Sequence, residues 1–272
     1  MIRCSKLKRR LRRGARVIQA RLISPLLPRE MFYVISHERS GTHFLMNTIL
    51  VNCYIKQGHH TIGEWFGPYD DLDHRFDHID AFNRKWQEAT AKASIIKSHC
   101  YRDLFVARYR KAKVVYILRD PRDTMVSWFH YLNSEAFQQY NSQVSDHHCD
   151  SVSRFLRRPV SPFLKHGFSL HGCFSNVVER WASHISGWLS APDTLVVHYE
   201  MLHRDYEAVL NKVVGFLGLP KRLWTRPVGL YDEPSVLPRK GNVGDWQNIL
   251  SADDEIFIRQ VVEGMNIEWT WK

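Results

Sequence analysis

The sequence predicts an α/β fold in which helices flank both faces of a central parallel sheet. Short apolar runs, of the kind that form buried parallel strands, recur along the chain. Segments with helical periodicity lie between or after these runs, and this alternation is typical of a parallel sheet covered on both faces. The 272 residues can bury a sizeable core. We therefore expect a single large domain.

The individual elements follow from hydrophobic periodicity. Four apolar runs predict strands: Met31–Ile35, Ala93–Ile96, Lys113–Leu118 and Thr194–His198. Helical patterns cover Thr42–Tyr54, Arg122–Leu132, Asn176–Leu189, Tyr206–Leu217 and Asp253–Val262, the last with Ser251 and Asp254 as a capping box. The stretches 57–80 and 133–172 lack clear periodicity and are predicted to be long loops, which in a compact domain usually serve a site.

Positive charge is concentrated near the N-terminus. The chain has 38 Lys and Arg against 28 Asp and Glu, a net charge of +10, and residues 1–30 hold ten basic side chains and one acidic one. The rest is nearly neutral, which argues against a broad nucleic-acid-binding face. We expect a basic amphipathic arm over residues 1–28 and one domain over residues 29–272, separated by a proline-containing break that disfavours helix.

The arm has apolar residues at helical spacing and an Arg- and Lys-rich opposite face. The apolar positions are Leu7, Leu11, Ala15, Ile18 and Leu22. Such a helix can dock on anionic lipid, so residues 1–24 predict peripheral membrane contact. A solvated arm, a helix packed on its own domain and a transit peptide stay open as alternatives. No nucleic-acid partner is expected.

Hydropathy and cysteine usage indicate a cytoplasmic protein. No stretch approaches the ~20 apolar residues of a spanning helix, and no apolar segment of a secretory signal follows the basic start. Five cysteines are scattered without a C-x-x-C pair, which fits reduced thiols better than a disulfide framework or a zinc site. We expect a cytoplasmic location, with the arm as a contact to a membrane surface.

The first predicted strand runs into a polar loop with a glycine, and a helix follows. The loop reads Ser36-His37-Glu38-Arg39-Ser40-Gly41-Thr42. Unpaired N–H groups and the helix dipole converge on such a loop, Arg39 adds a full charge, and Gly41 allows close approach of a ligand. This predicts an anion site in a P-loop-like domain. A plain Ser- or Thr-capped helix is the alternative, and the missing G-x-x-x-x-G-K-S/T pattern argues against ATP or GTP hydrolysis.

A second anion-binding group is predicted where the strand Lys113–Leu118 ends. Arg119 follows this strand directly, at the edge where open α/β sheets bind ligands. Ser127 lies eight residues on, about two turns into the next helix. We interpret the pair as a second phosphate site, with a salt bridge by Arg119 as the alternative.

A cationic, glycine-containing segment lies near the C-terminus. Arg239 and Lys240 precede Gly241 and Gly244 in a region without strand or helix periodicity. Such a loop suits closure over a phosphate, and a solvated surface loop is the alternative.

The strand that begins at Ala93 ends in Lys97-Ser98-His99. Histidine is the side chain best suited to act as a general base near neutral pH. A lone histidine is more often structural, but directly after Lys97 at a strand end His99 becomes a candidate catalytic group.

Taken in their order along the chain, the four groups resemble the sulfotransferase family that uses 3′-phosphoadenosine 5′-phosphosulfate (PAPS), over about residues 31–250. The segment from Arg39 through His43 and Phe44 is similar to its 5′-phosphosulfate loop. Arg119 with Ser127 is similar to its 3′-phosphate site, and Lys97-x-His99 to its catalytic element. Arg239-Lys240-Gly241 is similar to its C-terminal loop. An unrelated fold has no reason to reproduce the ordered set.

The resemblance implies transfer of a sulfuryl group from PAPS, the co-substrate, to an acceptor hydroxyl or amine, without a metal. His99 would be the general base, and Lys97 and Arg39 would stabilise charge on the sulfuryl group and bridging oxygen. The nucleotide-binding residues implied are Arg39, Ser40, Gly41, Thr42, His43, Phe44, Arg119, Ser127, Tyr199, Arg239, Lys240 and Gly241. A small-molecule kinase is the alternative enzyme, and a membrane- or RNA-binding module driven by the arm is the non-enzymatic alternative.

The sequence departs from the family pattern inside the phosphate loop. Arg39 replaces a lysine, so a planar fork stands where the family has a point charge. His43 replaces a threonine, and Phe44 replaces a tryptophan but can still stack on adenine with less area. Glu38 replaces a proline beside an anion site, so we expect it to point away or to pair with a cation. The family's C-terminal dimerisation pattern is missing, and no such dimer is predicted.

The acceptor is the least determined part of the prediction. The two predicted loops contribute aromatic residues that can line a pocket for an apolar alcohol, although scattered aromatics more often pack in a core: Trp65, Phe66, Tyr69, Phe137, Tyr140, Phe155 and Phe163. The interspersed His, Asp and Asn would equally suit a carbohydrate acceptor. We favour a small or lipid-like alcohol.

Overall fold

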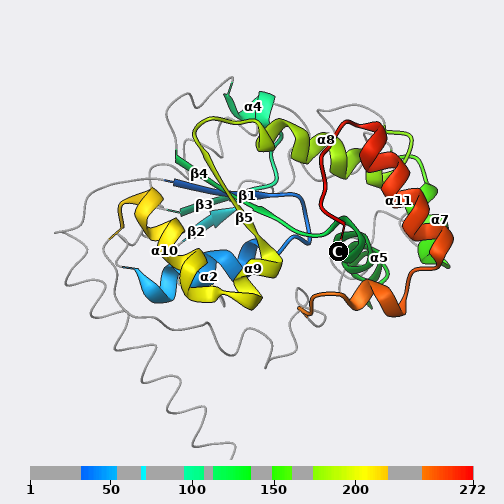
Figure 1. The fold of residues 1–272 in the computed structure, drawn as a ribbon, viewed down its shortest axis with the longest axis horizontal. Coiled ribbons are helices and arrows are strands. Elements are labelled where there is room, and N and C mark those ends of the chain that lie inside the picture. Colours follow the sequence, from blue (N-terminus) through cyan, green and yellow to red (C-terminus); the bar gives the residue numbers. More distant parts are fainter. Residues whose placement is uncertain are drawn as a thin grey trace, which may run out of the picture.

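The computed structural model describes residues 32–53, 69–71, 95–106, 113–135, 149–160, 174–219 and 241–271. Within these ranges five parallel strands form one sheet in the order β2-β3-β1-β4-β5 (Figure 1). Their bounds are Phe32–Ser36 (β1), Tyr69–Asp71 (β2), Ile95–Ser98 (β3), Lys113–Leu118 (β4) and Thr194–His198 (β5). The expected parallel sheet is confirmed. The arm over residues 1–28, Arg239 and Lys240 lie outside the described residues.

Two layers of helices sandwich the sheet, because successive residues of a strand point to opposite faces. Phe32 and Val34 of β1 pack into one hydrophobic cluster, and Tyr33 and Ile35 pack into another. The first cluster is covered by α2 (Thr42–Asn52), α9 (Tyr199–Arg204) and α10 (Tyr206–Leu217). The second is covered by α4 (Arg102–Val106), α5 (Pro121–Leu132), α7 (Val152–Arg157), α8 (Val177–Leu189) and α11 (Ala252–Gly264) (Figure 1). Helices on both faces are therefore confirmed.

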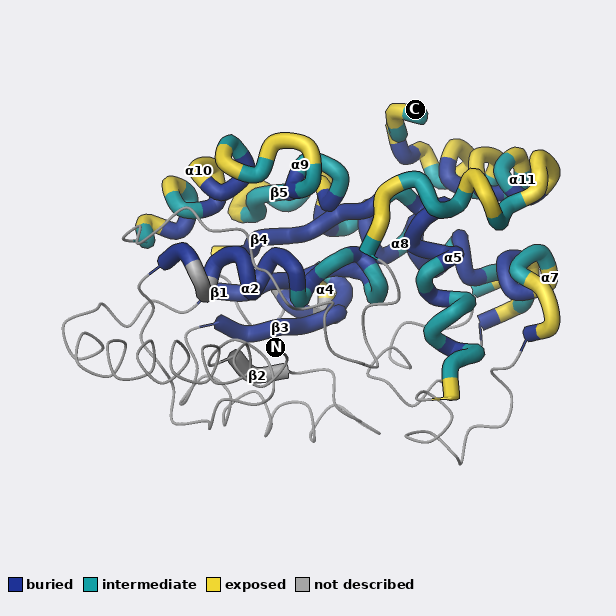
Figure 2. Tube along the Cα trace, turned by 90° about the horizontal axis from the view of Figure 1, so that it is seen from below, coloured by how far each residue is buried: buried dark blue, intermediate teal, exposed yellow. Residues whose placement is uncertain are grey.

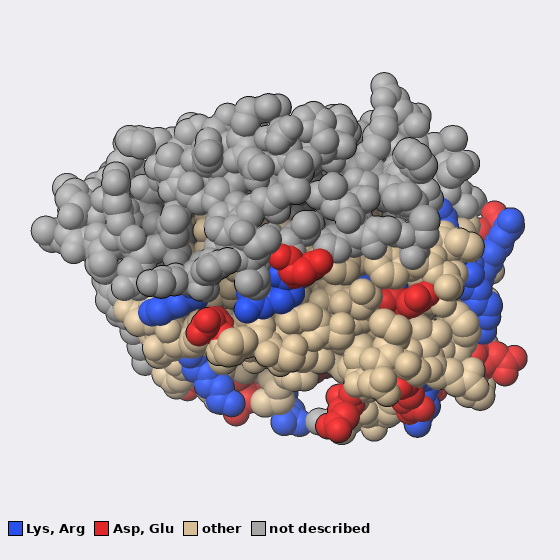
Figure 3. All heavy atoms as spheres, turned by 90° about the horizontal axis from the view of Figure 1, so that it is seen from above, with Lys and Arg blue, Asp and Glu red and all other residues tan. Residues whose placement is uncertain are grey.

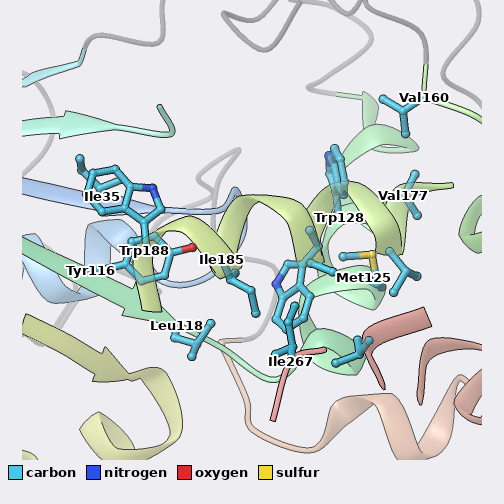
Figure 4. Packing of buried hydrophobic residues seen from close by; sticks show 14 of the residues in the cluster. Ile35, Tyr116, Leu118, Met125, Trp128, Val160, Val177, Ile185, Trp188 and Ile267 are labelled. Atoms are coloured by element: carbon cyan, nitrogen blue, oxygen red, sulfur yellow. The ribbon is translucent and has the colours of Figure 1, made fainter. Parts of the chain in front are cut away.

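The core lies between the strands and these helices. Figure 2 shows β1, β3 and β4 buried, whereas the outer surfaces of α10 and α11 are exposed. The helices α5 and α8 contribute large buried side chains to the core on their face of the sheet, among them Met125, Trp128, Ile185 and Trp188 (Figure 4). None of the described helices has the length and apolar character that crossing a membrane requires. Figure 3 shows one face of the molecule, on which the described Lys and Arg side chains are interspersed with Asp and Glu.

Side chains cap the N-terminal ends of α5 and α11. Asp120 caps α5 by accepting a hydrogen bond from the Arg122 N–H (2.8 Å), and Pro121 occupies the first turn, where its missing N–H costs nothing. The predicted capping box of α11 is confirmed: the Ser251 side chain accepts from the Asp254 N–H, and the Asp254 carboxylate accepts from the Ser251 N–H.

Two elements correct the prediction of long loops at 57–80 and 133–172. The strand β2 lies in the first stretch, and α7 lies in the second. The helix α7 begins at a side-chain cap, where Ser151 Oγ accepts from the Arg154 N–H (3.3 Å), and it buries Phe155 and Leu156. Phe155, predicted as one of the aromatics that can line an acceptor pocket, is a core residue with 1% of its surface exposed.

Candidate active site

The predicted site residues meet at one edge of the sheet, where β1, β3 and β4 end. The register pairs Ile35 with Ser98 and Ser36 with Ile117, so the residues that follow these three strands lie side by side. Ligands of open α/β sheets bind at this carboxyl edge. The topology therefore brings the loop after Ser36 together with His99 and Arg119.

The loop after β1 is shaped by two residues with positive φ, Arg39 (64°) and Gly41 (93°). A Cβ atom at Gly41 would lie 2.3 Å from Tyr199 Cδ2, so only glycine fits beneath this ring. Gly41 also caps α2, and it supplies no side chain to satisfy the first N–H groups of that helix. Ser40 Oγ is buried and has no hydrogen-bond partner among the described residues. These are the properties of an anion site at a helix N-terminus.

Changing Gly41 to alanine is expected to destabilise the fold and to abolish nucleotide binding. The left-handed backbone alone costs about 1–3 kcal/mol for a residue with a Cβ, and the contact with Tyr199 forces that ring to move. Gly215 in α10 is the matched control, because nothing lies within 4 Å of a Cβ there; Gly215→Ala should be neutral or stabilise by about 0.5–1 kcal/mol. Thermal unfolding and adenosine 3′,5′-bisphosphate titration measure both, and equal behaviour of the two variants would contradict the prediction.

His99 is held by the end of β1. Its Nδ1 lies 2.7 Å from the Ser36 carbonyl oxygen and 3.2 Å from Ser36 Oγ. A carbonyl oxygen only accepts, so Nδ1 carries the proton and Nε2 carries the lone pair of the neutral ring. Ser36 Oγ also lies 2.5 Å from Thr42 Oγ1. Ser36, which sequence reasoning did not select, thus links the candidate base to the phosphate loop.

Lys97 lies two residues before His99, within β3. It pairs with Val34 and Asp71 in the sheet, and only 6% of its surface is exposed. The alternation along β3 places it on the same face as Ile95, the face that α2 covers. Lys97 and His99 are therefore both buried, and the pairing of Lys97 with Val34 places it beside the strand that leads into the phosphate loop.

Arg119 connects the segments around the candidate nucleotide site. Its Nη1 donates to the Arg39 carbonyl oxygen (3.0 Å) and its Nη2 to the Asn242 carbonyl oxygen (2.9 Å). The guanidinium lies 4.6 Å from the centre of the Tyr199 ring. Its Nε is buried without a hydrogen-bond partner among the described residues. The salt-bridge alternative has only weak support, since Asp123 Oδ2 lies 3.9 Å away.

Arg39 and Ser127, predicted to serve different phosphates, lie together. Arg39 Nε donates to Ser127 Oγ (3.3 Å), and the guanidinium lies over the Tyr131 ring at 4.6 Å. The side chain of Arg39 therefore extends toward α5. This contact joins the two predicted phosphate-binding groups directly.

The segment 241–246 is fastened to the turn between β4 and α5. Tyr199 Oη donates to the Gly241 carbonyl oxygen (2.7 Å). The Asp123 carboxylate accepts from the N–H groups of Gly244 (2.7 Å) and Trp246 (3.2 Å). Burial raises the pKa of Asp123, against the opposing effects of Arg119 and these two N–H donors. Sequence reasoning did not select Asp123 as a site residue, since its hydrogen-bond partners, Gly244 and Trp246, lie more than a hundred residues away.

Phe44 and His43 occupy the first turns of α2. Phe44 is 3% exposed and packs edge-on against Tyr199 (6.0 Å between ring centres) and at a tilt against His203 (5.2 Å). The ring thus lies in the core beneath Tyr199, rather than presenting an open face on which adenine could stack. His43 is half-buried beside it.

Glu38 pairs with a buried cation, as expected from its place beside an anion site. Its Oε1 lies 2.6 Å from Arg180 Nη2, and its Oε2 lies 3.4 Å from His37 Nε2. Burial alone would raise the pKa of Glu38, but Arg180 and the nearby histidines lower it well below its ordinary value. The loop therefore keeps a net positive character at Arg39, because the charge of Glu38 is neutralised internally.

The buried histidines predict that stability falls as the solution is acidified. Burial lowers the pKa of His37 from 6.5 to about 4 and that of His184 well below 6.5. Both rings stay neutral in the folded protein but gain a proton on unfolding below pH 6.5, so unfolding takes up protons. For two protons, the free energy of unfolding falls by up to about 2.7 kcal/mol for each pH unit of acidification. The raised pKa values of Asp123 and Glu200 partly offset this loss, because these carboxyl groups take up protons more readily in the folded state. Urea unfolding at pH 7 and pH 5 measures it, and equal stability would contradict the prediction.

The comparisons with known proteins agree with this geometry. Residues 29–268 match the family model described as "Sulfotransferase domain". The chain belongs to the sulfotransferase domain family. Human sulfotransferase 2B1 is 28% identical over 195 residues, which are 61% of this chain and 48% of that protein. A 3-alpha-hydroxysteroid sulfotransferase of Cavia porcellus is 27% identical over 209 residues, 60% of this chain and 63% of that protein.

The chain spans about half to just under two thirds of the length of these curated relatives. Among solved structures, the mouse sulfotransferase SULT7A1 complexed with PAP has a TM-score of 0.56 at 18% identity, covering 89% of this chain and 87% of that one. This likeness shows that the sulfotransferase fold is shared.

Proposed function

We propose that this protein is a sulfotransferase, which moves the sulfuryl group of PAPS to a hydroxyl or amine of an acceptor. The observation that carries the proposal is the convergence at one sheet edge: Ser36 joins His99 to the phosphate loop, and Arg119 joins that loop to the segment after Gly241. The candidate general base and the two arginines, Arg39 and Arg119, thus follow three neighbouring strands, β3, β1 and β4.

The donor set fits a ligand with two separate anionic groups. Ser40 Oγ and Arg119 Nε are buried polar atoms without hydrogen-bond partners among the described residues, and the left-handed backbone at Gly41 lies directly beneath the Tyr199 ring. We assign Arg39, Ser40, Gly41 and Thr42 to the 5′-phosphosulfate, and Arg119 and Ser127 to the 3′-phosphate. Gly241, with Arg239 and Lys240, completes the 3′-phosphate site. Tyr199 and His43 border the adenosine, and Phe44 supports the Tyr199 ring from the core.

The chemistry assigned to the protein is positioning and charge stabilisation. Bound PAPS supplies an electrophilic sulfur with adenosine 3′,5′-bisphosphate as the leaving group. His99 Nε2 accepts the proton of the acceptor as the new oxygen–sulfur bond forms and the bond from sulfur to the bridging phosphate oxygen breaks. Lys97 and Arg39 stabilise the negative charge on the sulfuryl and bridging oxygens. A kinase reaction finds no support in the loop, which has no Lys before Thr42.

The acceptor we propose is a small or lipid-like alcohol, with a steroid as the first class to test. The support comes from its relatives, which include a 3-alpha-hydroxysteroid sulfotransferase at 27% identity. A carbohydrate is the second class. We also propose a cytoplasmic site of action, with residues 1–24 as a peripheral contact to anionic membrane and residues 29–272 as the transferase domain.

The test is incubation of the full chain with PAPS that carries radiolabelled sulfate and with one acceptor at a time: a sterol, an aliphatic alcohol, a phenol or a sugar. Parallel reactions replace PAPS with ATP labelled on its terminal phosphate. Labelled product from an alcohol and none from ATP supports the proposal. Transfer from ATP, or no transfer to any acceptor together with no binding of adenosine 3′,5′-bisphosphate, would refute it. Deleting residues 1–24 should leave the chemistry intact and lower binding to vesicles that contain phosphatidylserine.

A further inference from the structure

One face of α8 carries a row of three buried side chains at four-residue intervals: Arg180, His184 and Trp188. Residues four apart lie one above the other on a helix, so the three side chains point in the same direction. Each of them bonds to a segment that follows β1 or β3. The row therefore contacts the phosphate loop at one end, through Arg180, and the segment that carries the candidate general base at the other, through His184 and Trp188.

The contacts of the row are short and directional. Arg180 Nη2 lies 2.6 Å from Glu38 Oε1 in the phosphate loop. His184 Nε2 lies 3.0 Å from the His99 carbonyl oxygen, and Trp188 Nε1 donates to the Cys100 carbonyl oxygen (3.1 Å). Because all three side chains are at most 1% exposed, these bonds form away from competing water.

The orientation of His184 is fixed from two sides. The His99 carbonyl oxygen only accepts, so His184 Nε2 carries the proton, and Nδ1 then accepts from Tyr116 Oη (2.9 Å). Tyr116 belongs to β4, and its ring stacks on Trp188 with 5.7 Å between ring centres (Figure 4). The lowered pKa of His184 is consistent with a neutral ring in this place.

The position of Arg180 is fixed in the same way. Its guanidinium lies over the Trp128 ring at 4.6 Å, and its carbonyl oxygen accepts from Tyr101 Oη (3.4 Å). The ion pair joins it to a loop residue that immediately precedes Arg39. The same helix therefore contacts both the phosphate loop, through Glu38, and the main chain at His99, through His184.

We propose that Arg180, His184 and Trp188 are positioning residues that set the distance between the phosphate loop and His99. The inference rests on the proposed function, and it extends that function to a helix outside the four sequence motifs. The row acts through Glu38 and through the main chain of His99 and Cys100. Misplacement of reacting groups by ~1 Å can cost about 10²-fold in rate, so the row should govern turnover more than nucleotide affinity.

The experiment compares ring substitutions along α8 in the full chain. Trp188→Phe removes the donor to Cys100 and keeps an aromatic ring. Trp181→Phe is the matched control, because Trp181 is equally buried on the same helix and its Nε1 has no hydrogen-bond partner among the described residues. His184→Phe removes the donor to His99, and His184→Gln retains an N–H at a similar reach.

The expected result is a fall in kcat of roughly 10- to 100-fold for His184→Phe and a smaller fall for Trp188→Phe. The Kd for adenosine 3′,5′-bisphosphate should change little, Trp181→Phe should resemble the wild type in kcat, and His184→Gln should recover most of the rate. The proposal is overturned if Trp188→Phe matches Trp181→Phe, or if His184→Phe and His184→Gln have equal kcat.

A readout without turnover separates this proposal from the proposed function. The imidazole ¹⁵N chemical shifts of His99, measured with adenosine 3′,5′-bisphosphate and no acceptor, should change in His184→Phe and not in Trp181→Phe. Unchanged shifts in His184→Phe overturn the positioning role. Absence of sulfuryl transfer in the wild type, with these shifts altered as expected, would refute the transferase and leave the positioning of His99 by α8 supported.

Discussion

Replacing His99 with alanine is expected to abolish measurable turnover while leaving the affinity for adenosine 3′,5′-bisphosphate nearly unchanged. A general base contributes typically about 10²–10⁴-fold to the rate. The contacts that hold the nucleotide in our proposal come from other residues: the loop around Gly41, Arg119 and the segment after Gly241. Steady-state transfer of labelled sulfate gives kcat, and calorimetric titration of adenosine 3′,5′-bisphosphate gives the affinity.

The pH profile sharpens the His99 experiment. Because His99 Nδ1 already donates to the Ser36 carbonyl oxygen, the base acts through Nε2 and must be neutral. The rate of the wild type should therefore fall as the solution is acidified, and any residual rate of His99→Ala should lose that dependence. Retained activity in His99→Ala would remove His99 from the role of base. Ser36→Ala is a milder companion variant, since it keeps the main-chain acceptor and loses the Oγ contact.

Changing Arg119 to alanine is expected to weaken nucleotide binding by at least about 10²-fold. In our proposal the guanidinium binds the 3′-phosphate, and hydrogen bonds to charged groups contribute about 1.5–3 kcal/mol each, with about 1.4 kcal/mol per tenfold in affinity. The same guanidinium also joins the carbonyl oxygens of Arg39 and Asn242, so its loss loosens the loops around the site. Arg119→Lys should restore little of the affinity. A lysine ammonium is a compact point charge, and it lacks the planar fork with which the guanidinium reaches both acceptors. Calorimetry with each variant measures the loss.

The role of Arg119 toward the 3′-phosphate is tested by a second ligand. Adenosine 5′-monophosphate lacks that phosphate, so the wild type should bind it much more weakly than adenosine 3′,5′-bisphosphate, and Arg119→Ala should lose the preference. Arg154 is the control, because it is largely exposed and pairs only across the surface with Asp150. A preserved preference in Arg119→Ala would show that this arginine acts only as a structural link.

The sheet and the edge that carries the site could be predicted because their signals are local. Each buried strand of four to six residues is an apolar run that ends in a charged or polar group, as at Ile95–Ser98 and Lys113–Leu118. Parallel topology then brings these ends together. Arg39, Arg119 and His99 could thus be selected without knowledge of their contacts.

The links between those ends could not be predicted, because they join residues far apart in the chain. Glu38 and Arg180 are 142 residues apart, and Arg119 and Asn242 are 123 apart. A carboxylate next to an anion loop indicates that a cation is nearby, but it does not say which one. The helix α7 was missed because a two-residue apolar core, Phe155 and Leu156, is too short for periodicity to show.

The fastening of the segment 241–246 has a consequence for how this part of the chain can change over evolutionary time. The hydrogen bonds described there all end on main-chain atoms: the carbonyl oxygens of Gly241 and Asn242 and the N–H groups of Gly244 and Trp246. Side chains at Asn242 and Val243 can therefore be exchanged without loosening the loop, and Val243 is already 46% exposed. Selection at this loop should act on its backbone conformation and on the residues that grip it from elsewhere.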